Sequence, residues 1–403
     1  MTNLPQGWEV KTLSEIGEIV TGSTPSKSNL DFYGKDYPFF KPSDFEQGYF
    51  LENAGDNLSK LGFGKARQLP PKTILVVCIG SLGKVALTKV IGSCNQQINA
   101  IIPHKNIISE YIYYYCISSK FQSILFSKAP QTTLAILNKT EFSKLEIIYP
   151  KDIKEQERIV GILDFAFSKI DENIKKAKEN LANIDELMQS ALQKAFNPLN
   201  DNTKENYQLP QSWEWKSLGD TSNYGKTSQV KPSQLKGNDW ILELEDIEKE
   251  SGVLLQKVLF QDRQSKSNKI KFNKGDILFG TLRPYLKKVI IADDNGACSS
   301  EIIPFSTGNS ITNHFIYYYL FANFLHDRIS SLTYGARMPR LGTKDGKSLQ
   351  IPLPPLQEQE QIAEHLDFVF EKAKALKELY TKELKDYEEL KQSLLDKAFK
   401  GEL

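Results

Sequence analysis

The stretch EQERIVGILDFAFSKI, residues 155–170, returns 203 residues later as EQEQIAEHLDFVFEKA, residues 358–373, with nine of sixteen positions identical. Other phrases return at nearly the same separation: LPQGWEVKTL (4–13) as LPQSWEWKSL (209–218), and ALQKAFNP (191–198) as LLDKAFKG (394–401). The order of the phrases is the same in both halves, and the period is far longer than the roughly 20–50 residues of a solenoid repeat. The sequence therefore predicts a pseudo-two-fold internal repeat, made of a pair of segments that occurs twice.

Each copy of the first phrase opens a segment with the spacing of a long helix. From Glu155 to Phe196 there is no proline and one glycine, and apolar residues recur in steps of three and four. The segment after Glu358 keeps this pattern, with an interruption at Glu383. Each segment predicts one helix of about 42 residues, roughly 60 Å long at 1.5 Å per residue.

A helix with one apolar stripe has to bury that stripe against another surface. Because the chain carries two such helices of similar length and pattern, we expect them to pair with each other as an antiparallel coiled coil. Two alternatives remain open at this point. Each helix can instead pack on its own globular domain or on another subunit.

The segments outside the helices have a mixed composition. Apolar runs such as KTILVVCI and GDILFGTL, bounded by Gly, Pro and Asn, are typical of strands, and the runs IYYYC and IYYYL favour buried helices. We therefore expect an α+β fold. Two globular α/β domains, residues 1–150 and 207–354, alternate with helical segments, residues 151–206 and 355–403.

Charge follows the same alternation. Residues 1–150 hold 15 basic and 12 acidic side chains and residues 207–354 hold 19 and 15, whereas the helical segments hold 9 and 11, and 8 and 12. No apolar run approaches the roughly 20 residues of a membrane span, and the first residues show no secretory leader. We expect a cytoplasmic protein. Its cysteines have no C-x-x-C spacing and are expected to be buried free thiols: Cys78, Cys94, Cys116 and Cys298.

Motifs that carry catalysis are missing. The sequence has no G-x-x-x-x-G-K-[ST] loop, no G-x-S-x-G elbow, no H-E-x-x-H and no amino-methylation motif. GSLGK (80–84) is interpreted as a turn between two strands. Glu9–Lys11 and Glu214–Lys216 fit the E-x-K fragment of some nucleases but are interpreted as the solvated start of each globular domain. We expect no catalytic residue, no metal site and no bound cofactor in this chain.

Basic and amide side chains gather instead on Gly-rich and Pro-rich loops of the two globular domains. Arg, Gln and Asn can hydrogen-bond to guanine and adenine edges, and Lys can anchor phosphates. One such residue alone is usually an ordinary surface charge, but the set favours a nucleic-acid surface. The candidate DNA-binding residues are Lys27, Lys41, Lys65, Arg67, Lys84, Gln96, Gln97, Lys226, Lys231, Arg263, Lys266, Lys269, Lys271, Arg283, Arg337, Arg340 and Lys344.

These features together resemble a known family. The two L-P-x-x-W openings, the loop TGSTPSKSN (21–29), and IPLPPLQEQEQIAEHLDFVF (351–370) followed by a long helix resemble the specificity subunit of type I restriction–modification systems, which act in phage defence. The resemblance spans the whole chain. The first copy of the junction, IIYPKDIKEQERI (147–159), keeps the Glu-Gln pair and lacks the double proline.

The resemblance implies a function and a set of partners. Residues 1–150 and 207–354 would be target-recognition domains that each read one half of an asymmetric, interrupted DNA site. The conserved helices would separate them and bind two methyltransferase subunits, and restriction/translocase subunits would join the complex. S-adenosylmethionine, Mg²⁺ and ATP would belong to those partners.

The acidic starts of the two helices are the candidate partner-binding sites: Glu155, Glu157, Glu358 and Glu360. Two other functions remain open. One is a self-sufficient sequence-specific DNA methyltransferase or nuclease, which the missing motifs disfavour. The other is a coiled-coil adaptor with no role on DNA.

Overall fold

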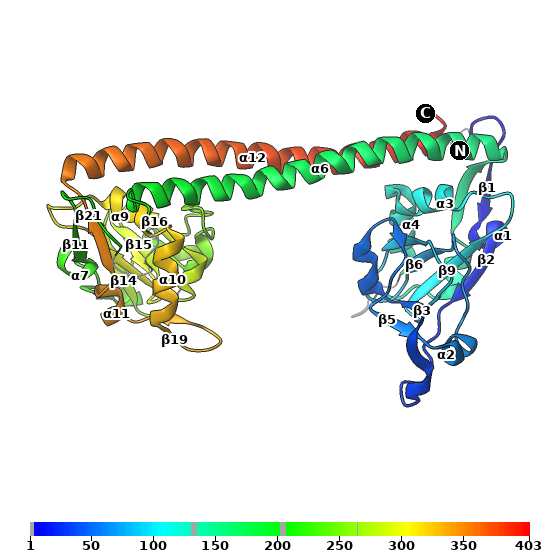
Figure 1. Cartoon of the computed structure of the whole chain (residues 1–403), viewed down its shortest axis with the longest axis horizontal. Helices are drawn as coiled ribbons and strands as arrows, with labels where there is room; N and C mark the ends of the chain where they lie inside the picture. Colours follow the sequence, from blue (N-terminus) through cyan, green and yellow to red (C-terminus); the bar gives the residue numbers. More distant parts are fainter. Residues whose placement is uncertain (1–3, 130–134, 202–206, 264) are drawn as a thin grey trace. The chain divides into compact units, whose positions relative to one another are not determined.

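A computed structural model describes residues 4–129, 135–201, 207–263 and 265–403 (Figure 1). The chain forms two compact units: unit 1 is Met1–Ala177 with Lys382–Leu403, and unit 2 is Lys178–Thr381. Each unit consists of one globular part and a stretch of both long helices. The sequence predicts domain boundaries where globular segments change to helices. The two compact units divide the chain differently, because each long helix contributes residues to both units.

The two long helices are α6 (Ile153–Phe196) and α12 (Leu356–Lys400). Asp152 caps the start of α6, where its carboxylate accepts the backbone N–H of Lys154 at 3.0 Å. After α12, Gly401 has a φ of +75°, and the N–H of Glu402 donates to the carbonyl of Lys397 at 2.9 Å. This left-handed glycine closes the helix end.

Within each unit the two helices run antiparallel. In unit 1, Arg158 near the start of α6 donates to the carbonyl of Leu403 at 2.8 Å, and Asp171 pairs with Lys391 at 2.6 Å. In unit 2, Asp185 pairs with Lys377. There, the side chains of Ile184, Met188 and Ala373 form a buried cluster. The antiparallel pairing expected from the shared pattern is thus confirmed inside each unit.

The globular part of unit 1 is built on a five-stranded sheet with the order β2-β9-β6-β7-β4, beside a three-stranded sheet β5-β3-β8 and the antiparallel pair β1-β10. The strands are β1 (Trp8–Thr12), β2 (Gly17–Thr21), β3 (Tyr33–Phe40), β4 (Phe50–Leu51), β5 (Asp56–Leu58), β6 (Ile74–Val77), β7 (Val85–Thr88), β8 (Ser93–Cys94), β9 (Ile98–Pro103) and β10 (Glu146–Pro150). The helices are α1 (Leu13–Ile16), α2 (Lys60–Lys65), α3 (Ser109–Ile117), α4 (Ser119–Lys128) and α5 (Lys139–Ser143), with 3-10 helices η1 (Leu30–Phe32) and η2 (Pro42–Gln47).

The globular part of unit 2 holds a four-stranded sheet β12-β14-β17-β13, a three-stranded sheet β16-β15-β18, and the pairs β11-β21 and β19-β20. The strands are β11 (Glu214–Ser217), β12 (Ser228–Val230), β13 (Trp240–Leu242), β14 (Lys269–Phe272), β15 (Ile277–Gly280), β16 (Val289–Ile291), β17 (Gly296–Cys298), β18 (Ile302–Phe305), β19 (Thr333–Tyr334), β20 (Arg340–Leu341) and β21 (Gln350–Leu353). The helices are α7 (Leu218–Thr221), α8 (Phe260–Arg263), α9 (Asn313–Tyr319), α10 (Asn323–Leu332) and α11 (Thr343–Lys347), with η3 (Pro232–Gln234), η4 (Leu244–Asp246) and η5 (Pro284–Leu286).

Several local predictions are confirmed. The predicted strand KTILVVCI contains β6, whose residues are all buried, and GSLGK lies in the turn between β6 and β7. The E-x-K fragments lie in the opening strands β1 and β11. All four cysteines are buried and free. Within the described ranges, no helix is both long and apolar enough to cross a membrane.

Candidate nucleic-acid and partner interfaces

The junction between each long helix and its globular part rests on one buried glutamine. In unit 1, the side-chain oxygen of Gln156 accepts the N–H of Ile108 at 2.9 Å, and its amide donates to the carbonyl of Pro150 at 3.0 Å. In unit 2, Gln359 repeats both contacts, with the N–H of Thr312 at 3.0 Å and a proline carbonyl at 2.8 Å. Both glutamines are 0% exposed. The Gln of the repeated Glu-Gln phrase therefore holds the helix start against the globular core.

The core of each globular part also packs against the C-terminal end of a long helix, α12 in unit 1 and α6 in unit 2. In unit 1, the ring of Phe399 packs edge-on against Tyr115, with 4.9 Å between centroids. In unit 2, Phe196 packs in the same way against Tyr319 at 5.1 Å. Phe196 is 0% exposed and Phe399 is 6% exposed. The globular part of unit 1 thus contacts the start of α6 and the end of α12. The globular part of unit 2 contacts the start of α12 and the end of α6.

In unit 1, two other candidate segments contact the loop at residues 21–29. The hydroxyl of Thr24 donates to the side-chain oxygen of Gln96 at 2.5 Å, and the backbone N–H of Arg67 donates to the Ser23 hydroxyl at 3.2 Å. The N–H of Ser23 also donates to the carbonyl of Cys94 at 3.0 Å. These bonds place Arg67 and Gln96 beside neighbouring residues of the loop, although the two are far apart in the sequence.

The other unit 1 candidates fall into two groups. Lys27, Lys65 and Arg67 are exposed, and none has an ion-pair partner among the described residues. The remaining three are engaged within the unit: Lys41 pairs with Asp56, Lys84 pairs with Glu46, and half-buried Gln97 accepts from the Asn95 amide at 2.8 Å.

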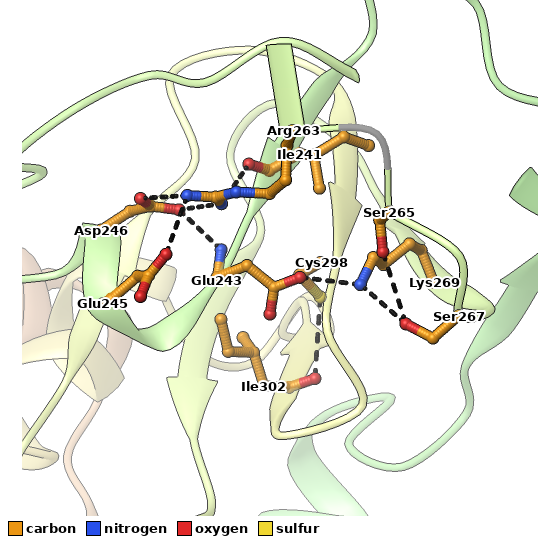
Figure 2. Close-up of polar contacts among 10 residues, drawn as sticks. All are labelled: Ile241, Glu243, Glu245, Asp246, Arg263, Ser265, Ser267, Lys269, Cys298 and Ile302. Carbon is orange, nitrogen blue, oxygen red and sulfur yellow. Dashed lines mark hydrogen bonds and ion pairs between the residues drawn. The ribbon is translucent and has the colours of Figure 1, made fainter. Parts of the chain in front are cut away.

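In unit 2, Arg263 points inward rather than to solvent (Figure 2). Its guanidinium holds Asp246 in a two-pronged ion pair with distances of 2.5 and 2.8 Å. Asp246 is 0% exposed. Burial alone would raise the pKa of Asp246, but hydrogen bonds from Arg263, the Glu243 N–H and Gln256 outweigh it and lower that pKa.

Lys269 has the same inward orientation. It is 3% exposed, and its amino group lies 2.7 Å from Glu243 and 3.0 Å from the Ser267 hydroxyl (Figure 2). The ammonium group of Lys269 is the buried charge of this pair, and removing the partner of a buried charge costs about 3–5 kcal/mol. Because both side chains are held in ion pairs and little exposed, they argue against the DNA contacts expected for Arg263 and Lys269.

The remaining unit 2 candidates lie at the surface. Arg340 is half-buried and 3.6 Å from Glu301. The others are exposed, and none has an ion-pair partner in the described part of the chain: Lys226, Lys231, Lys266, Lys271, Arg283, Arg337 and Lys344. Backbone pairing of β12 with β14 brings Lys271 opposite Ser228. Among the basic candidates, seven in unit 2 and three in unit 1 are exposed without an ion-pair partner in the described part of the chain.

A cleft of about 590 Å³ opens among these loops in unit 2. Its walls combine basic, acidic and apolar side chains: Glu243, Leu244, Glu245, Arg263, Ser265, Leu282, Arg283, Leu286, Lys288, Glu301 and Met338. Met338 is not among the residues predicted from the sequence, because an exposed methionine beside charged residues carries no motif.

Exposed apolar side chains recur at matched positions of the two helices. Unit 1 exposes Phe165 (68%) and Leu390 (45%), and unit 2 exposes Phe368 (59%) and Leu187 (59%), with 203 residues between the members of each matched pair. Ile153 and Leu356, also matched, are 37% and 43% exposed. Each unit thus offers the same apolar residue types from the start of one helix and the end of the other.

The candidate partner-binding glutamates lie beside these residues in sequence. Glu157 and Glu360 are exposed and have no ion pair among the described residues, whereas Glu155 holds Arg158 at 2.7 and 2.8 Å. In unit 2, Glu358 lines a groove of about 590 Å³ between α6 and α12, together with Leu187, Ile362 and other residues.

Among the described residues, no group of three or more His, Cys, Asp or Glu side chains is arranged to hold a metal ion. Burial raises the pKa of the Cys78 and Cys94 thiols to about 12, so neither is a thiolate at neutral pH.

Comparison with known proteins finds one family throughout. The family model described as "Type I restriction modification DNA specificity domain" matches residues 5–183 and again residues 210–385. The HindI specificity subunit of Haemophilus influenzae is 39% identical over 42% of this chain and 38% of its own length. The MjaIX specificity subunit of Methanocaldococcus jannaschii is 29% identical over 54% of this chain and 52% of its own length. The chain thus spans about half of those proteins or less.

Other similarities extend over the whole chain. The EcoDI specificity subunit of Escherichia coli is 23% identical over 99% of this chain and 89% of its own length. A solved chain from work on complex assembly and conformational transition of the type I R-M system covers 100% of both chains, with a TM-score of 0.78 and 19% identity. The HsdS subunit from Thermoanaerobacter tengcongensis covers 99% of this chain, with a TM-score of 0.54 and 20% identity. These structures share the fold. Because the family model matches most of the sequence in two copies, the chain belongs to the type I restriction–modification DNA specificity family.

Proposed function

We propose that this chain is the DNA sequence-specificity subunit of a type I restriction–modification complex. It binds an asymmetric, bipartite DNA site, with one half read by each globular part, and it performs no catalysis itself. The observation that carries this proposal is the duplication: two globular parts share one framework, while the loops with unpaired basic side chains differ between them.

Two joined readers bind DNA more tightly than one. Once one half-site is bound, the second binds intramolecularly at a high effective concentration. Unlike reading loops imply unlike half-sites, and hence an asymmetric target. Unpaired lysines such as Lys27 and Lys266 are suited to phosphates, where each neutralised phosphate releases counterions and makes binding depend on salt.

The matched apolar residues on the helices support a second part of the proposal. Two copies of one partner, the methyltransferase subunit, dock on the two units through Phe165 and Phe368 and through the neighbouring acidic side chains. Restriction/translocase subunits join this assembly. S-adenosylmethionine, Mg²⁺ and ATP bind to these partners.

The DNA proposal is tested by mapping methylated bases after incubation of DNA with the full chain, its methyltransferase subunits and S-adenosylmethionine. We expect a motif with two unlike halves and no methylation when the chain is used alone. A perfect palindrome would contradict the asymmetric reading. Methyl transfer or DNA cleavage by the purified chain alone would favour the self-sufficient enzyme instead.

The partner proposal is tested by stoichiometry. Phe165→Asp or Phe368→Asp alone should leave one methyltransferase copy bound per chain, and the double variant should leave none, as measured by the mass of the purified complex. Leu379→Asp is the matched control, because Leu379 is 58% exposed on α12 and its counterpart in α6 is Lys176. Full assembly of the double variant would refute this docking site.

A further inference from the structure

The hairpin β19–β20 of unit 2 is braced by a turn from a different part of the chain. The N–H of Arg283, in the turn between β15 and β16, donates to the carbonyl of Pro339 at 2.7 Å. The N–H of Leu341 donates to the carbonyl of Thr281 at 3.0 Å. Two backbone bonds therefore fix the base of the hairpin, while residues 335–338 at its tip are exposed.

The turn keeps an arginine where the backbone favours glycine. Arg283 has a φ of +50°, in the left-handed region that costs a non-glycine residue about 1 kcal/mol or more. In unit 1 the matching position is Gly80, with a φ of +83°, because residues 74–77 of β6 correspond to residues 277–280 of β15. A side chain retained at such a position, exposed and without an ion-pair partner among the described residues, indicates a role for the guanidinium itself.

The hairpin tip exposes side chains that normally avoid water. Tyr334 is 60% exposed and Met338 is 54% exposed, and Arg337 between them is also exposed. Met338 lines the same cleft as Arg283, so the tip and the turn border one opening. A fixed hairpin with apolar and guanidinium groups at its tip has the composition of a surface that contacts a ligand.

The cleft below the tip is unsuited to phosphate. Glu243, Glu245 and Glu301 line it, with side-chain exposures of 25%, 75% and 36%, and would repel a phosphodiester. Arg263 and Lys269 are already engaged by Asp246 and Glu243 (Figure 2). Carboxylates accept hydrogen bonds from amino groups, and the amino groups that DNA presents in its major groove are those of cytosine and adenine.

We propose that the β19–β20 tip and the turn at Arg283 form the base-reading element of unit 2, which contacts base-pair edges in the major groove. Arg337 and Arg283 provide forks for guanine, Met338 provides an apolar contact for a thymine methyl group, and Glu301 accepts from an exocyclic amino group. Lys266 and Lys271 contact phosphates. This inference rests on the proposed function and adds which residues determine sequence.

The test compares Arg337→Ala, Arg337→Lys, Met338→Ala and Lys266→Ala in the full chain assembled with its methyltransferase subunits. The probe is a library of duplex DNA that carries the methylated motif of the unaltered protein, randomised at one base pair at a time. Bound and unbound fractions are sequenced at several salt concentrations. The half-site read by unit 1 is an internal control.

Both Arg337 variants should lose about 10-fold discrimination at one or two base pairs of one half-site, because lysine cannot form the two-pronged contact with guanine. Met338→Ala should lose a few-fold at a thymine in the same half. Lys266→Ala should weaken binding to all sequences and reduce the salt slope by about one.

Three results would overturn the assignment. They are unchanged base preferences in Arg337→Lys, a uniform loss of affinity in the Arg337 variants, and altered preferences in both half-sites. A complex of the unaltered protein that selects no sequence from the library would overturn the proposed function as well, so the two failures are distinguishable.

Discussion

The junctions with the long helices are alike in the two units, whereas the loops that face away from them differ. Gln156 and Gln359 make matching pairs of buried hydrogen bonds. In the loops, Lys41 and Glu243 both donate a backbone N–H to the aspartate three residues later, at 2.7 and 2.8 Å, yet their side chains carry opposite charges. The comparison indicates a constant framework that holds exchangeable reading surfaces.

The strongest test of a common framework is the phenylalanine at the end of each helix. Phe399→Ala should destabilise unit 1, and Phe196→Ala should destabilise unit 2, each by about 3–5 kcal/mol, because each removes a buried ring. Native-state hydrogen exchange, followed separately over residues 98–117 and 302–319, measures the two effects. Equal loss of protection in both units from one variant would contradict this division.

The buried glutamines should follow with a smaller effect. Gln156→Leu and Gln359→Leu leave a backbone N–H and carbonyl groups unpaired, and each should cost the affected unit about 2–3 kcal/mol. Denaturant unfolding of the two variants should give similar losses. A loss in only one variant would show that the two junctions are not energetically equivalent.

Acid sensitivity should distinguish the units. His326 and Gln122 stand at matched positions and contact matched carbonyls, of Leu320 and Cys116, both at 2.6 Å. Burial, with a smaller contribution from Lys287, lowers the pKa of His326 to about 4. Because this folded-state pKa lies below the usual 6.5, the neutral imidazole contributes its full stability above pH 6.5. That contribution is lost as the pH falls towards 4, by ~3 kcal/mol.

The matched control for this prediction is His326→Gln, which installs the residue of unit 1. Unit 2 of this variant should lose its added pH dependence between 6.5 and 4, as followed by hydrogen exchange over residues 313–332. His104→Gln, at an exposed position in unit 1, should change nothing. Unaltered acid sensitivity in His326→Gln would exclude His326 as the cause.

The smallest expected effect concerns one matched tyrosine in each unit, on α3 in unit 1 and on α9 in unit 2. Tyr114 donates to Asp164 at 2.6 Å, and Tyr318 donates to Asp367 in the same way. Tyr114→Phe and Tyr318→Phe should each cost about 1 kcal/mol, since the aspartates remain in contact with water. Thermal unfolding of the paired variants should show similar shifts, and a shift in only one would weaken the comparison.

The framework could be predicted from sequence because its signals are periodic and repeated. The expected helix from Glu155 to Phe196 differs from α6 by two residues at its start. The inward orientation of Arg263 and Lys269 could not be predicted, since their partners Asp246 and Glu243 lie 17 and 26 residues away and meet them only in the folded domain. Gln156 and Gln359 carried no such distinguishing signal, because the glutamates on either side of each glutamine are identical in the two copies as well.

The most direct test of a constant framework with two separate readers is an exchange of residues 207–354 for the corresponding part of another family member. The methylated motif is then mapped with the same methyltransferase subunits. The account predicts that one half of the motif changes while the other half stays the same. A change in both halves would contradict it.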